Sequence, residues 1–486
     1  MGPTYEAQEN LMSQSSISTQ PGQLEESNDK ARARRGKVAR ARVTRSSHGD
    51  WAPAASRPDP IDILRQQATT RVEDLVPIRH GRMAASAFAF FRGAAAVMAA
   101  DLASSPHSGL DVQLCGDAHL ANFGGFASPE RSLIFDVNDF DETLPGPFEW
   151  DVKRLAASLE IAARARGFDE TVRAKVVAEA MRSYRETIRS FALMTNLDIW
   201  YARLDMDSIL RTWGPELGGA AIKRFRRTVD KAGSKDRLKA KAKLTRFVDG
   251  ELRFASDPPL LVPYQELYSG TDAQGVHDRI GLALSSYGET LNGDRRRLLA
   301  GYRFVDLARK VVGVGSVGTR SWVALMVGRD DNDPLFLQVK EAEASVLEPH
   351  LTASEFDNHG QRVVEGQQLM QSASDIFLGW QRVDGIDGRT HDYYMRQLWD
   401  WKASADIDNM EPVMLEVYGQ LCGWVLASAH ARSGDPIAIG SYLGAAATFD
   451  EALVRFGRSY ADQNELDHQQ LVAEIAAGRI PAIPGI

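Results

Sequence analysis

The chain has few cysteines and no long apolar run. Its 486 residues include two cysteines, Cys115 and Cys422, which cannot build a disulfide framework. The longest mostly apolar stretch, 83–102, is interrupted by Arg92, so no membrane-spanning helix is expected. Residues 1–16 lack the basic segment and apolar core of a secretory signal. These absences favour a protein of the reducing cytoplasm without a membrane partner.

The chain also lacks an excess of positive charge, since its formal net charge is -8. This balance argues against a chain devoted to nucleic acid. Two basic segments remain, 30–45 and 223–246. The first segment can be interpreted as a solvated tail, as a product of an upstream start codon, or as an arm that binds nucleic acid or an anionic membrane. The second is a solvated face, or a platform for nucleic acid or another anion. We favour the solvated interpretation for both.

The length exceeds that of one ordinary core, so two lobes are expected. Residues 1–56 show no periodicity and are interpreted as a disordered basic tail. Residues 57–298 are predicted to form a helical lobe, residues 299–405 a sheet lobe, and residues 406–486 the helices that complete the first lobe. The fold class is therefore α+β, with a mainly helical large lobe and a small antiparallel-sheet lobe.

Hydrophobic periodicity and turn residues give the element boundaries. Helices are expected from Ile61, over 83–103, 150–166, 170–193, 299–310, 359–374, 412–432 and 449–477, and twice within 223–246. Strands are expected at 113–115, 132–136, 311–327, 335–340, 377–380 and 393–397. The segments 311–327 and 335–340 read as a hairpin, because 328–334 is rich in Gly, Asp, Asn and Pro.

The first chemical constellation is a loop followed by an apolar strand that ends in acidic residues. Asp117 precedes Asn122 by five residues, and Asp139 and Asp141 follow the strand. Phosphoryl transfer needs a carboxylate to orient the attacking hydroxyl, and oxygen ligands for Mg²⁺ beside the phosphates. Asp117 suits the catalytic role, and Asn122, Asp139 and Asp141 suit the metal. The alternative is that these side chains only cap helices or make Asx-turns.

The second constellation is a glycine-rich loop between strand-like segments. Its backbone N–H groups could cover nucleotide phosphates, and the predicted nucleotide-binding residues there are Gly313, Gly315, Ser316 and Gly318. Lys340 ends the next strand, at the distance expected of a lysine that contacts the α- and β-phosphates. Glu365 is the first candidate to pair with Lys340, and Glu348 the second. The alternative is an ordinary hairpin turn and strand-end lysine.

The first constellation resembles the catalytic loop of aminoglycoside and choline phosphotransferases, which reads His-Gly-Asp-x-His-x-x-Asn. Residues 116–122 read Gly-Asp-Ala-His-Leu-Ala-Asn, so the resemblance implies a catalytic Asp117, a supporting His119 and a metal-binding Asn122. It also implies metal binding by the Asp-Phe-Asp of 139–141 and a structural role for Asp151, which would brace the loop. The chain departs from that pattern at Cys115, where those enzymes usually have His.

The order of the two constellations is reversed, because those kinases place the glycine loop and lysine before the catalytic loop. Here they follow it by about two hundred residues. We therefore predict a circularly permuted kinase-like fold, in which Lys340 and Asp139 face one cleft. A non-permuted alternative uses 429–435, which contains His430 and Asp435 but lacks the following Asn and Asp-Phe-Asp. We favour the permuted order, and His430 is then interpreted as a packed or capping residue near a helix end.

The chain also resembles a bacterial family named as domain of unknown function 2252. The resemblance rests on five strings, which are residues 75–79, 88–93, 116–124, 338–342 and 460–464. It covers most of residues 58–475 and implies no particular reaction.

Three arginines, Arg79, Arg82 and Arg92, precede the catalytic segment. They suit bidentate contacts to phosphate, or they pair with acids such as Asp101 and Asp151. Three aromatic residues, Trp200, Tyr201 and Trp322, could stack on a ligand. Packing in the core is the favoured interpretation for each.

The leading hypothesis is an ATP- and Mg²⁺-dependent phosphotransferase that acts on a small molecule. Its supporting residues would include Arg79 and Arg92 beside the catalytic and nucleotide-binding sets. The alternatives are nucleotidyl transfer from the same site, a nucleotide-binding regulatory module without turnover, and a nucleic-acid-binding protein. Only the last predicts an affinity that falls steeply with salt.

Overall fold

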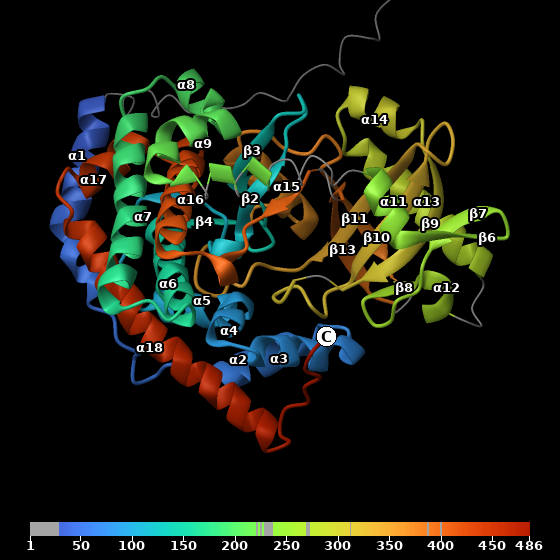
Figure 1. Ribbon diagram of the computed structural model, residues 1–486, viewed down its shortest axis with the longest axis horizontal. Coiled ribbons are helices and arrows are strands. Elements are labelled where there is room, and N and C mark those ends of the chain that lie inside the picture. Colours follow the sequence, from blue (N-terminus) through green and yellow to red (C-terminus); the bar gives the residue numbers. More distant parts are fainter. Residues whose placement is uncertain are drawn as a thin grey trace, which may run out of the picture.

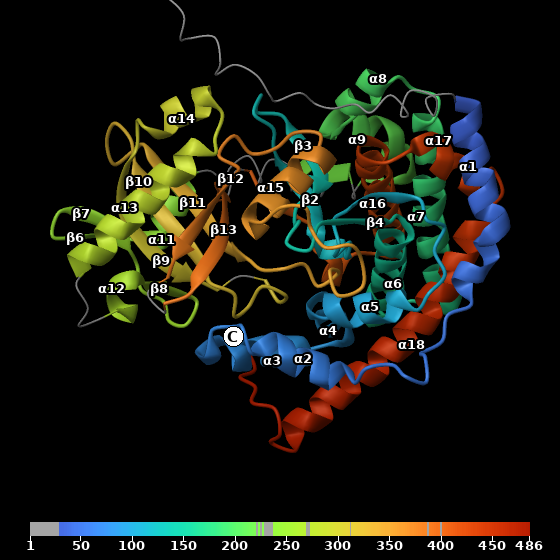
Figure 2. The ribbon, with the colours of Figure 1, turned by 180° about the vertical axis from the view of Figure 1, so that it is seen from behind.

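The structure is a computed structural model of the 486-residue chain. It describes residues 29–219, 222–223, 226–227, 237–268, 273–311, 313–385, 388–398 and 401–486. The molecule is α+β, as predicted. Figures 1 and 2 show a mainly helical part on one side and an antiparallel sheet with its own helices on the other.

The helical part is built from both ends of the described chain. Its N-terminal helices are α1 (Asp29–Arg42), η3 (Arg45–Gly49), α2 (Pro60–Ala68), η4 (Glu73–Leu75), α3 (Val76–Ala84), α4 (Ala87–Gly93) and α5 (Ala95–Ala103). The middle helices are η5 (Leu120–Asn122), α6 (Glu149–Ala165), α7 (Glu170–Phe191), α8 (Asn196–Tyr201), α9 (Met206–Trp213) and η6 (Gly214–Glu216). The C-terminal helices are η7 (Ile407–Asn409), α16 (Pro412–Ser433), α17 (Pro436–Leu443) and α18 (Thr448–Ala476).

Short strands carry the predicted catalytic segment within this part. A two-stranded sheet pairs β1 (Asp111–Leu114) with β4 (Leu144–Pro147). A second sheet has the order β14-β2-β3-β5, with the bounds β2 (Phe123–Ala127), β3 (Leu133–Val137), β5 (Leu204–Asp205) and β14 (Ala403–Ser404). The antiparallel hairpin β2–β3 pairs Phe123 with Val137, which brings the end of one predicted site segment beside the start of the next.

The sheet part is organised around six antiparallel strands in the order β12-β13-β11-β10-β9-β8. The strands are β8 (Leu261–Pro263), β9 (Arg303–Lys310), β10 (Ser321–Val327), β11 (Pro334–Ala342), β12 (Gly379–Asp384) and β13 (Thr390–Gln397). The hairpin β6 (Thr245–Val248) and β7 (Glu251–Phe254) lies beside them. The accompanying helices are α11 (Arg237–Leu244), α12 (Tyr264–Leu267), α13 (Ala273–Glu289), α14 (Gly293–Leu299) and α15 (His359–Met370).

Each of the two parts is stabilised by its own apolar packing. In the helical part, α6, α7, α16 and α18 share a core that includes Leu155, Tyr184, Leu426 and Phe456. Helices α7 and α16 approach so closely that a Cβ on Gly423 would lie 2.4 Å from the carbonyl oxygen of Ala180. The two faces of the six-stranded sheet are covered by separate clusters, one against α11 and β7 and one against α13.

Several predicted elements are correct in type and place. The helices over 150–166, 170–193, 359–374, 412–432 and 449–477 correspond to α6, α7, α15, α16 and α18. The predicted hairpin is β10–β11, although its first strand begins at Ser321 and not at 311. In that hairpin Val327 pairs with Pro334 across the predicted turn.

Four predictions of local structure are wrong. Residues 29–49, placed in a disordered tail, form α1 and η3, because Arg32 and Arg35 bind Asp435 and η3 buries His48. The predicted helix 83–103 is three helices, since Ser86 caps α4 and Ala94 leaves the helical conformation. The predicted helix 299–310 is mostly strand β9, whose residues pair with β10. The predicted boundary at 298 and 299 divides elements that pack together, since β8 pairs with β9.

The second basic segment is only partly described. Its C-terminal part forms α11 as predicted, and the first of the two expected helices lies largely outside the described residues. Within the described ranges, no single helix is long and apolar enough to cross a membrane. The bent pair α17 and α18 reaches that length and composition only when taken together.

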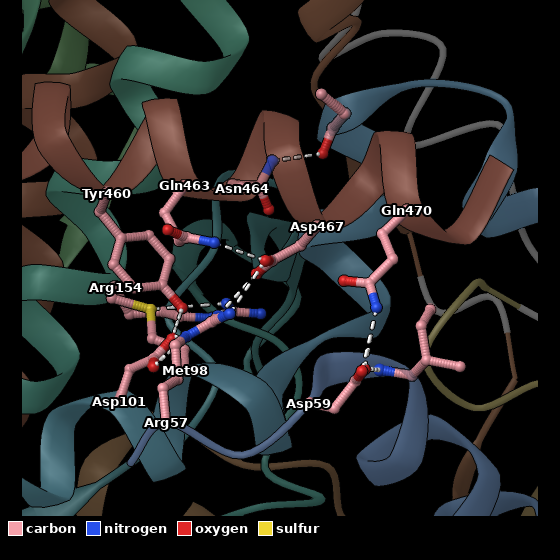
Figure 3. A network of polar contacts seen from close by, with 12 residues as sticks. Arg57, Asp59, Met98, Asp101, Arg154, Tyr460, Gln463, Asn464, Asp467 and Gln470 are labelled. Carbon is pink, nitrogen blue, oxygen red and sulfur yellow. Dashed lines mark hydrogen bonds and ion pairs between the residues drawn. The ribbon is translucent and has the colours of Figure 1, made fainter. Parts of the chain in front are cut away.

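An ion-pair network fastens the N-terminal segment to α18 (Figure 3). Arg57 donates to Asp101 at 2.7 and 2.9 Å and to Asp467 at 2.9 and 2.6 Å. Tyr460 adds a hydrogen bond of 3.0 Å to Asp101. Both carboxylate side chains are almost fully buried, at 2% and 4% exposure, so they need this counter-charge. The burial of Arg57 lowers its pKa, but the two carboxylates outweigh burial and raise it.

Replacing Arg57 with Met is expected to destabilise the fold by about 3–5 kcal/mol, because two buried carboxylates lose their shared partner. The measurement is the free energy of unfolding in urea. Arg65→Met is the matched control, since Arg65 is half exposed in its contacts with Asp62 and Glu474 and should cost about 0–1 kcal/mol. Equal urea midpoints for the two variants would contradict the prediction.

Candidate active site

The predicted catalytic segment is fixed by its backbone. It leaves β1 through Gly116, whose φ of 83° favours glycine, and a Cβ there would lie 2.2 Å from the carbonyl oxygen of Glu142. Asp151, in the first turn of α6, accepts the N–H groups of Cys115 at 2.7 Å and Gly116 at 3.0 Å. This contact gives Asp151 the bracing position that the resemblance implied.

Asp117 lies directly after this brace and is held by charged and polar neighbours. Arg154 of α6 donates to its Oδ1, with Nη2 at 2.7 Å and Nε at 2.8 Å. His119 Nε2 is 3.6 Å from Oδ2, and the Asn122 Nδ2 donates to the Asp117 carbonyl at 2.8 Å. Burial lowers the pKa of His119 to about 4, so its ring is neutral at pH 7.

The second acidic segment meets Lys340 of β11. Lys340 Nζ lies 2.5 Å from Asp141 and 3.6 Å from Asp139, although the first pair is 199 residues apart in sequence. Tyr394 of β13 pairs with Lys340 across the sheet and donates to Asp141 at 2.6 Å. Lys340 and Asp139 were expected to face one cleft. They lie in contact, but Asp139 lines the cavity described below and Lys340 does not. We refer to Asp139, Asp141, Lys340 and Tyr394 as the lysine cluster.

The protonation states in the lysine cluster follow from burial and opposite charge. Burial alone would raise the pKa of Asp139, but the positive charges of Lys340 and Arg396 outweigh burial and lower this pKa to about 2. Burial and the neighbouring Asp139 raise the pKa of Asp141. Burial lowers the pKa of Lys340, and the two carboxylates outweigh burial and raise it. Lys340, which is 2% exposed, is thus a buried ammonium held by two carboxylates.

The predicted pairing of Lys340 with Glu365 is wrong, and Glu348 does not pair with it either. Helix α15 contributes Arg362 instead, which donates to the carbonyl oxygens of Asp141 and Glu343, each at 2.8 Å. The carboxylates that neutralise the lysine therefore come from the acidic segment, and α15 supports the backbone of that segment.

The glycine-rich loop connects β9 to β10, so it lies between two antiparallel strands. The strand after the loop was predicted, whereas the strand before it was expected to be a helix. Gly313 and Gly318 have φ of 65° and 93°. Arg71 donates to the Val317 carbonyl at 2.5 Å, and Arg82 donates to the Gly313 carbonyl. The loop is therefore fastened to the N-terminal helices of the helical part.

These segments enclose one cavity of about 810 Å³. The predicted residues that line it are Asp117, His119, Asn122, Asp139, Asp141, Gly313, Gly315, Ser316, Arg79 and Arg92. Four others do not line it, and these are Gly318, Lys340, Glu365 and Asp151. The cleft is thus formed by the predicted catalytic segment, the acidic segment, the glycine loop, residues within 341–350 and the helices α2 to α5.

The predicted arginine cluster divides into two kinds. Arg79 and Arg92 line the cavity, whereas Arg82 is bound to the carbonyl oxygens of Gly313 and Ile486. The alternative pairing with Asp101 or Asp151 is wrong, since Asp101 binds Arg57, and Asp151 accepts backbone N–H groups. Arg71 and Glu142 are among the cavity residues that were not anticipated.

The other predicted candidates lie away from this cavity. His430 is buried in α16 and contacts Tyr184 at 2.8 Å and Asp151 at 3.4 Å, which agrees with a packed residue. Asp435 caps α17, so the 429–435 alternative is not a loop facing a cleft. Trp200 and Tyr201 are exposed, contrary to the core-packing interpretation. Trp322 is half-buried and stacks on Tyr268.

The oxygen donors in the cleft suit a metal that is shared with phosphate. Asn122 uses its nitrogen to bind the Asp117 carbonyl, which leaves Oδ1 as the candidate ligand oxygen. Over the described ranges, no group of three or more His, Cys, Asp or Glu side chains is arranged to hold a metal ion. Mg²⁺ commonly takes only one or two carboxylates from a protein and completes its shell with water and phosphate oxygens. The residues present therefore fit Mg²⁺ only together with a bound phosphate.

Sequence reasoning missed three residues that hold the site together. Arg154 stands three residues after Asp151 on α6, so a helical projection places both on one face. Tyr394 and Arg396 pair with Lys340 and Gln338 of β11. Only the strand register, which local sequence does not specify, identifies these last two.

Fold and site together define an α+β protein with an acidic and glycine-rich cleft between a helical part and an antiparallel sheet. A family model described as "Uncharacterized protein conserved in bacteria (DUF2252)" matches residues 71–474, so the chain belongs to this bacterial family. Neither the curated proteins nor the solved structures contain a significant match. The matched region contains the predicted catalytic segment, the acidic segment and Lys340.

Replacing Asp151 with Asn is expected to destabilise the protein by about 1–3 kcal/mol, because one buried N–H of the catalytic segment loses its acceptor. The measurement is the free energy of unfolding in urea. Asp111→Asn is the control, since Asp111 is exposed at the start of β1. A D151N variant as stable as D111N would show that the brace contributes nothing.

Proposed function

We propose that this protein transfers the γ-phosphoryl group of ATP to a hydroxyl group of a small molecule. The observation that carries the proposal is the convergence of Asp117, Asn122, Asp139 and the glycine loop on one cavity, with Lys340 bound to Asp139 behind it. These are the residue types that phosphoryl transfer uses to orient the acceptor and to neutralise phosphate charge.

The order of elements in the sheet part supports the proposal. A strand, the glycine loop and a second strand are followed by β11 with Lys340 and then by α15. Protein kinases use a glycine loop, a lysine on their third strand and a following helix in this order. With the catalytic segment placed earlier in the chain, the proposed fold is kinase-like and circularly permuted.

The adenine base is proposed to bind against the N-terminal helices. The apolar side chains next to Lys340 on its sheet face are unavailable, because Phe336 packs on Phe254 within a closed cluster. The cavity has other apolar lining, contributed by Ile63, Ala95, Ala96, Ala100, Val314 and Val346. This lining lies on the same cavity as Gly313, so a nucleotide can extend from it toward the glycine loop.

In the proposed reaction Asp117 accepts a hydrogen bond, and then the proton, from the acceptor hydroxyl. The hydroxyl oxygen forms the new bond to the γ-phosphorus, the bridging bond to the β-phosphate oxygen breaks, and ADP leaves. Arg154 keeps Asp117 oriented. Mg²⁺, held by Asp139 and Asn122, would neutralise the phosphates, and Asp141 would keep Lys340 in place.

Incubation with γ-labelled ATP, Mg²⁺ and a metabolite pool is expected to yield a labelled small molecule. Asp117→Asn should lower the rate by about 10²–10⁴-fold, because the general base is lost. Asp111→Asn should retain the rate of the unaltered protein. Transfer of label from α-labelled ATP instead would identify nucleotidyl transfer, and transfer from neither would contradict both reactions.

Replacing Lys340 with Met is expected to weaken ADP binding by about tenfold, because Asp139, the proposed Mg²⁺ ligand, loses the ammonium that positions it. Isothermal titration in the presence of Mg²⁺ measures the affinity. Lys175→Met, which changes an exposed lysine of α7, is the control. An unchanged ADP affinity in a folded K340M protein would remove Lys340 from the proposed nucleotide site.

A further inference from the structure

Three arginines on one wall of the cavity have no carboxylate partner. They are Arg71, just before η4, Arg79 of α3 and Arg92 of α4, and all three line the 810 Å³ cavity. We call them the arginine wall. The ion pairs within the described part of the chain, taken at 4.0 Å or less, include none of the three.

Several donors of the arginine wall are buried without a hydrogen-bond partner. They are Nε of Arg71, Nε and Nη1 of Arg79, and Nε of Arg92. Arg79 is only 1% exposed, and its Nη2 donates to Gln67 and to the Gly93 carbonyl. The Arg71 side chain makes one hydrogen bond, to the Val317 carbonyl. An unpaired buried cation and unsatisfied donors are costly, so this wall lacks an anionic partner.

No carboxylate of the described residues lies within ion-pair distance of the wall. Glu343 and Glu142 act on Arg71 only at longer range, and three others are paired elsewhere. Asp117 binds Arg154, and Asp101 binds Arg57. Glu341 binds Arg320 and His391, at 3.1 and 2.8 Å. Burial lowers the pKa of Arg79, and the nearby charge of Arg71 lowers it further. This mutual repulsion means that a bound anion would stabilise both arginines.

The wall lies beside the parts of the cleft that handle phosphate in the proposed reaction. A Cβ on Gly315 of the glycine loop would lie 3.3 Å from the Arg92 carbonyl oxygen, and one on Gly318 would lie 3.0 Å from the Arg71 side chain. Arg92 is also close enough to Asp117 for the carboxylate to oppose the lowering of its pKa by burial. Planar guanidinium groups match phosphate oxygens in bidentate geometry.

We infer that the arginine wall is a binding site for a phosphate group. Two sources carry that chemistry, the polyphosphate of the nucleotide and a phosphate on the acceptor substrate. Assignment to one of them rests on the proposed function, whereas binding of the anion itself does not. If the acceptor supplies the group, the substrate is a phosphorylated small molecule with a free hydroxyl near Asp117.

The test uses the full chain and isothermal titration with inorganic phosphate and with pyrophosphate. The unaltered protein should bind at least one of them, and Arg92→Met should weaken that binding by about tenfold or more, as the loss of one charged contact implies. Arg79→Met should act in the same direction. Arg65→Met is the control, because Arg65 lies on α2 outside the cavity lining.

A titration of phosphate at saturating ADP identifies the source. Phosphate that still binds belongs to an acceptor site, and phosphate that ADP displaces belongs to the nucleotide site. The inference is overturned if neither anion binds the unaltered protein, or if R92M binds as tightly as R65M. Should R79M fail to fold, R92M still decides the question, since Arg92 is half-buried and makes no hydrogen bond among the described residues.

The two proposals fail separately. Asp117→Asn should lower the rate of label transfer and should not weaken phosphate binding, because it removes a negative charge beside Arg92 and no donor of the wall. Phosphate binding without label transfer in the unaltered protein would overturn the phosphotransferase and retain the arginine wall. Label transfer with unaltered phosphate affinity in R92M would overturn the arginine wall and retain the phosphotransferase.

Discussion

The buried ammonium of Lys340 joins the two parts of this molecule. Its strand belongs to the six-stranded sheet, whereas the carboxylates that neutralise it, Asp139 and Asp141, follow β3 in the helical part. A lysine that is 2% exposed requires such a partner, so the sheet and the acidic segment must meet. Arg362 and Arg396 extend the same contact by donating to the carbonyl oxygens of Asp141 and Asn138. The contact between Lys340 and the two carboxylates therefore sets where the sheet and the helical part meet, and the cleft lies at that junction.

The rest of the cleft is arranged by the same rule of matched buried charge. Asp151 accepts two backbone N–H groups of the catalytic segment, and Arg154, one helical turn later, holds Asp117. Outside the cleft, Arg57 compensates Asp101 and Asp467 and thereby ties α18 to the N-terminal segment (Figure 3). The arginine wall is the exception, since its charges lack a carboxylate partner and several of its donors are unpaired, and this is why it indicates a ligand.

Local patterns were sufficient wherever one short segment determines its own structure. The helices α6, α7, α16 and α18 have continuous apolar faces, and the β10–β11 turn has the residues that a turn requires. Local patterns failed where packing decided. Residues 303–310 look helical in isolation but form β9, because β8 and β10 pair with them on both sides. The basic helix α1 has almost no apolar face and is retained by ion pairs from Arg32 and Arg35 to Asp435.

The sequence by itself determined the residue types and spacings of the candidate site, namely Asp117 with Asn122, the Asp139–Asp141 segment, and the glycine loop followed by Lys340. It also determined the α+β class, because helical and strand periodicities are local properties. Only the tertiary structure decided that Lys340 pairs with Asp141 rather than Glu365, that Tyr394 and Arg154 complete the site, and which arginines remain unpaired. Those partners depend on strand register and on contacts between distant segments, where the burial of charge, and not local spacing, selects the neighbour.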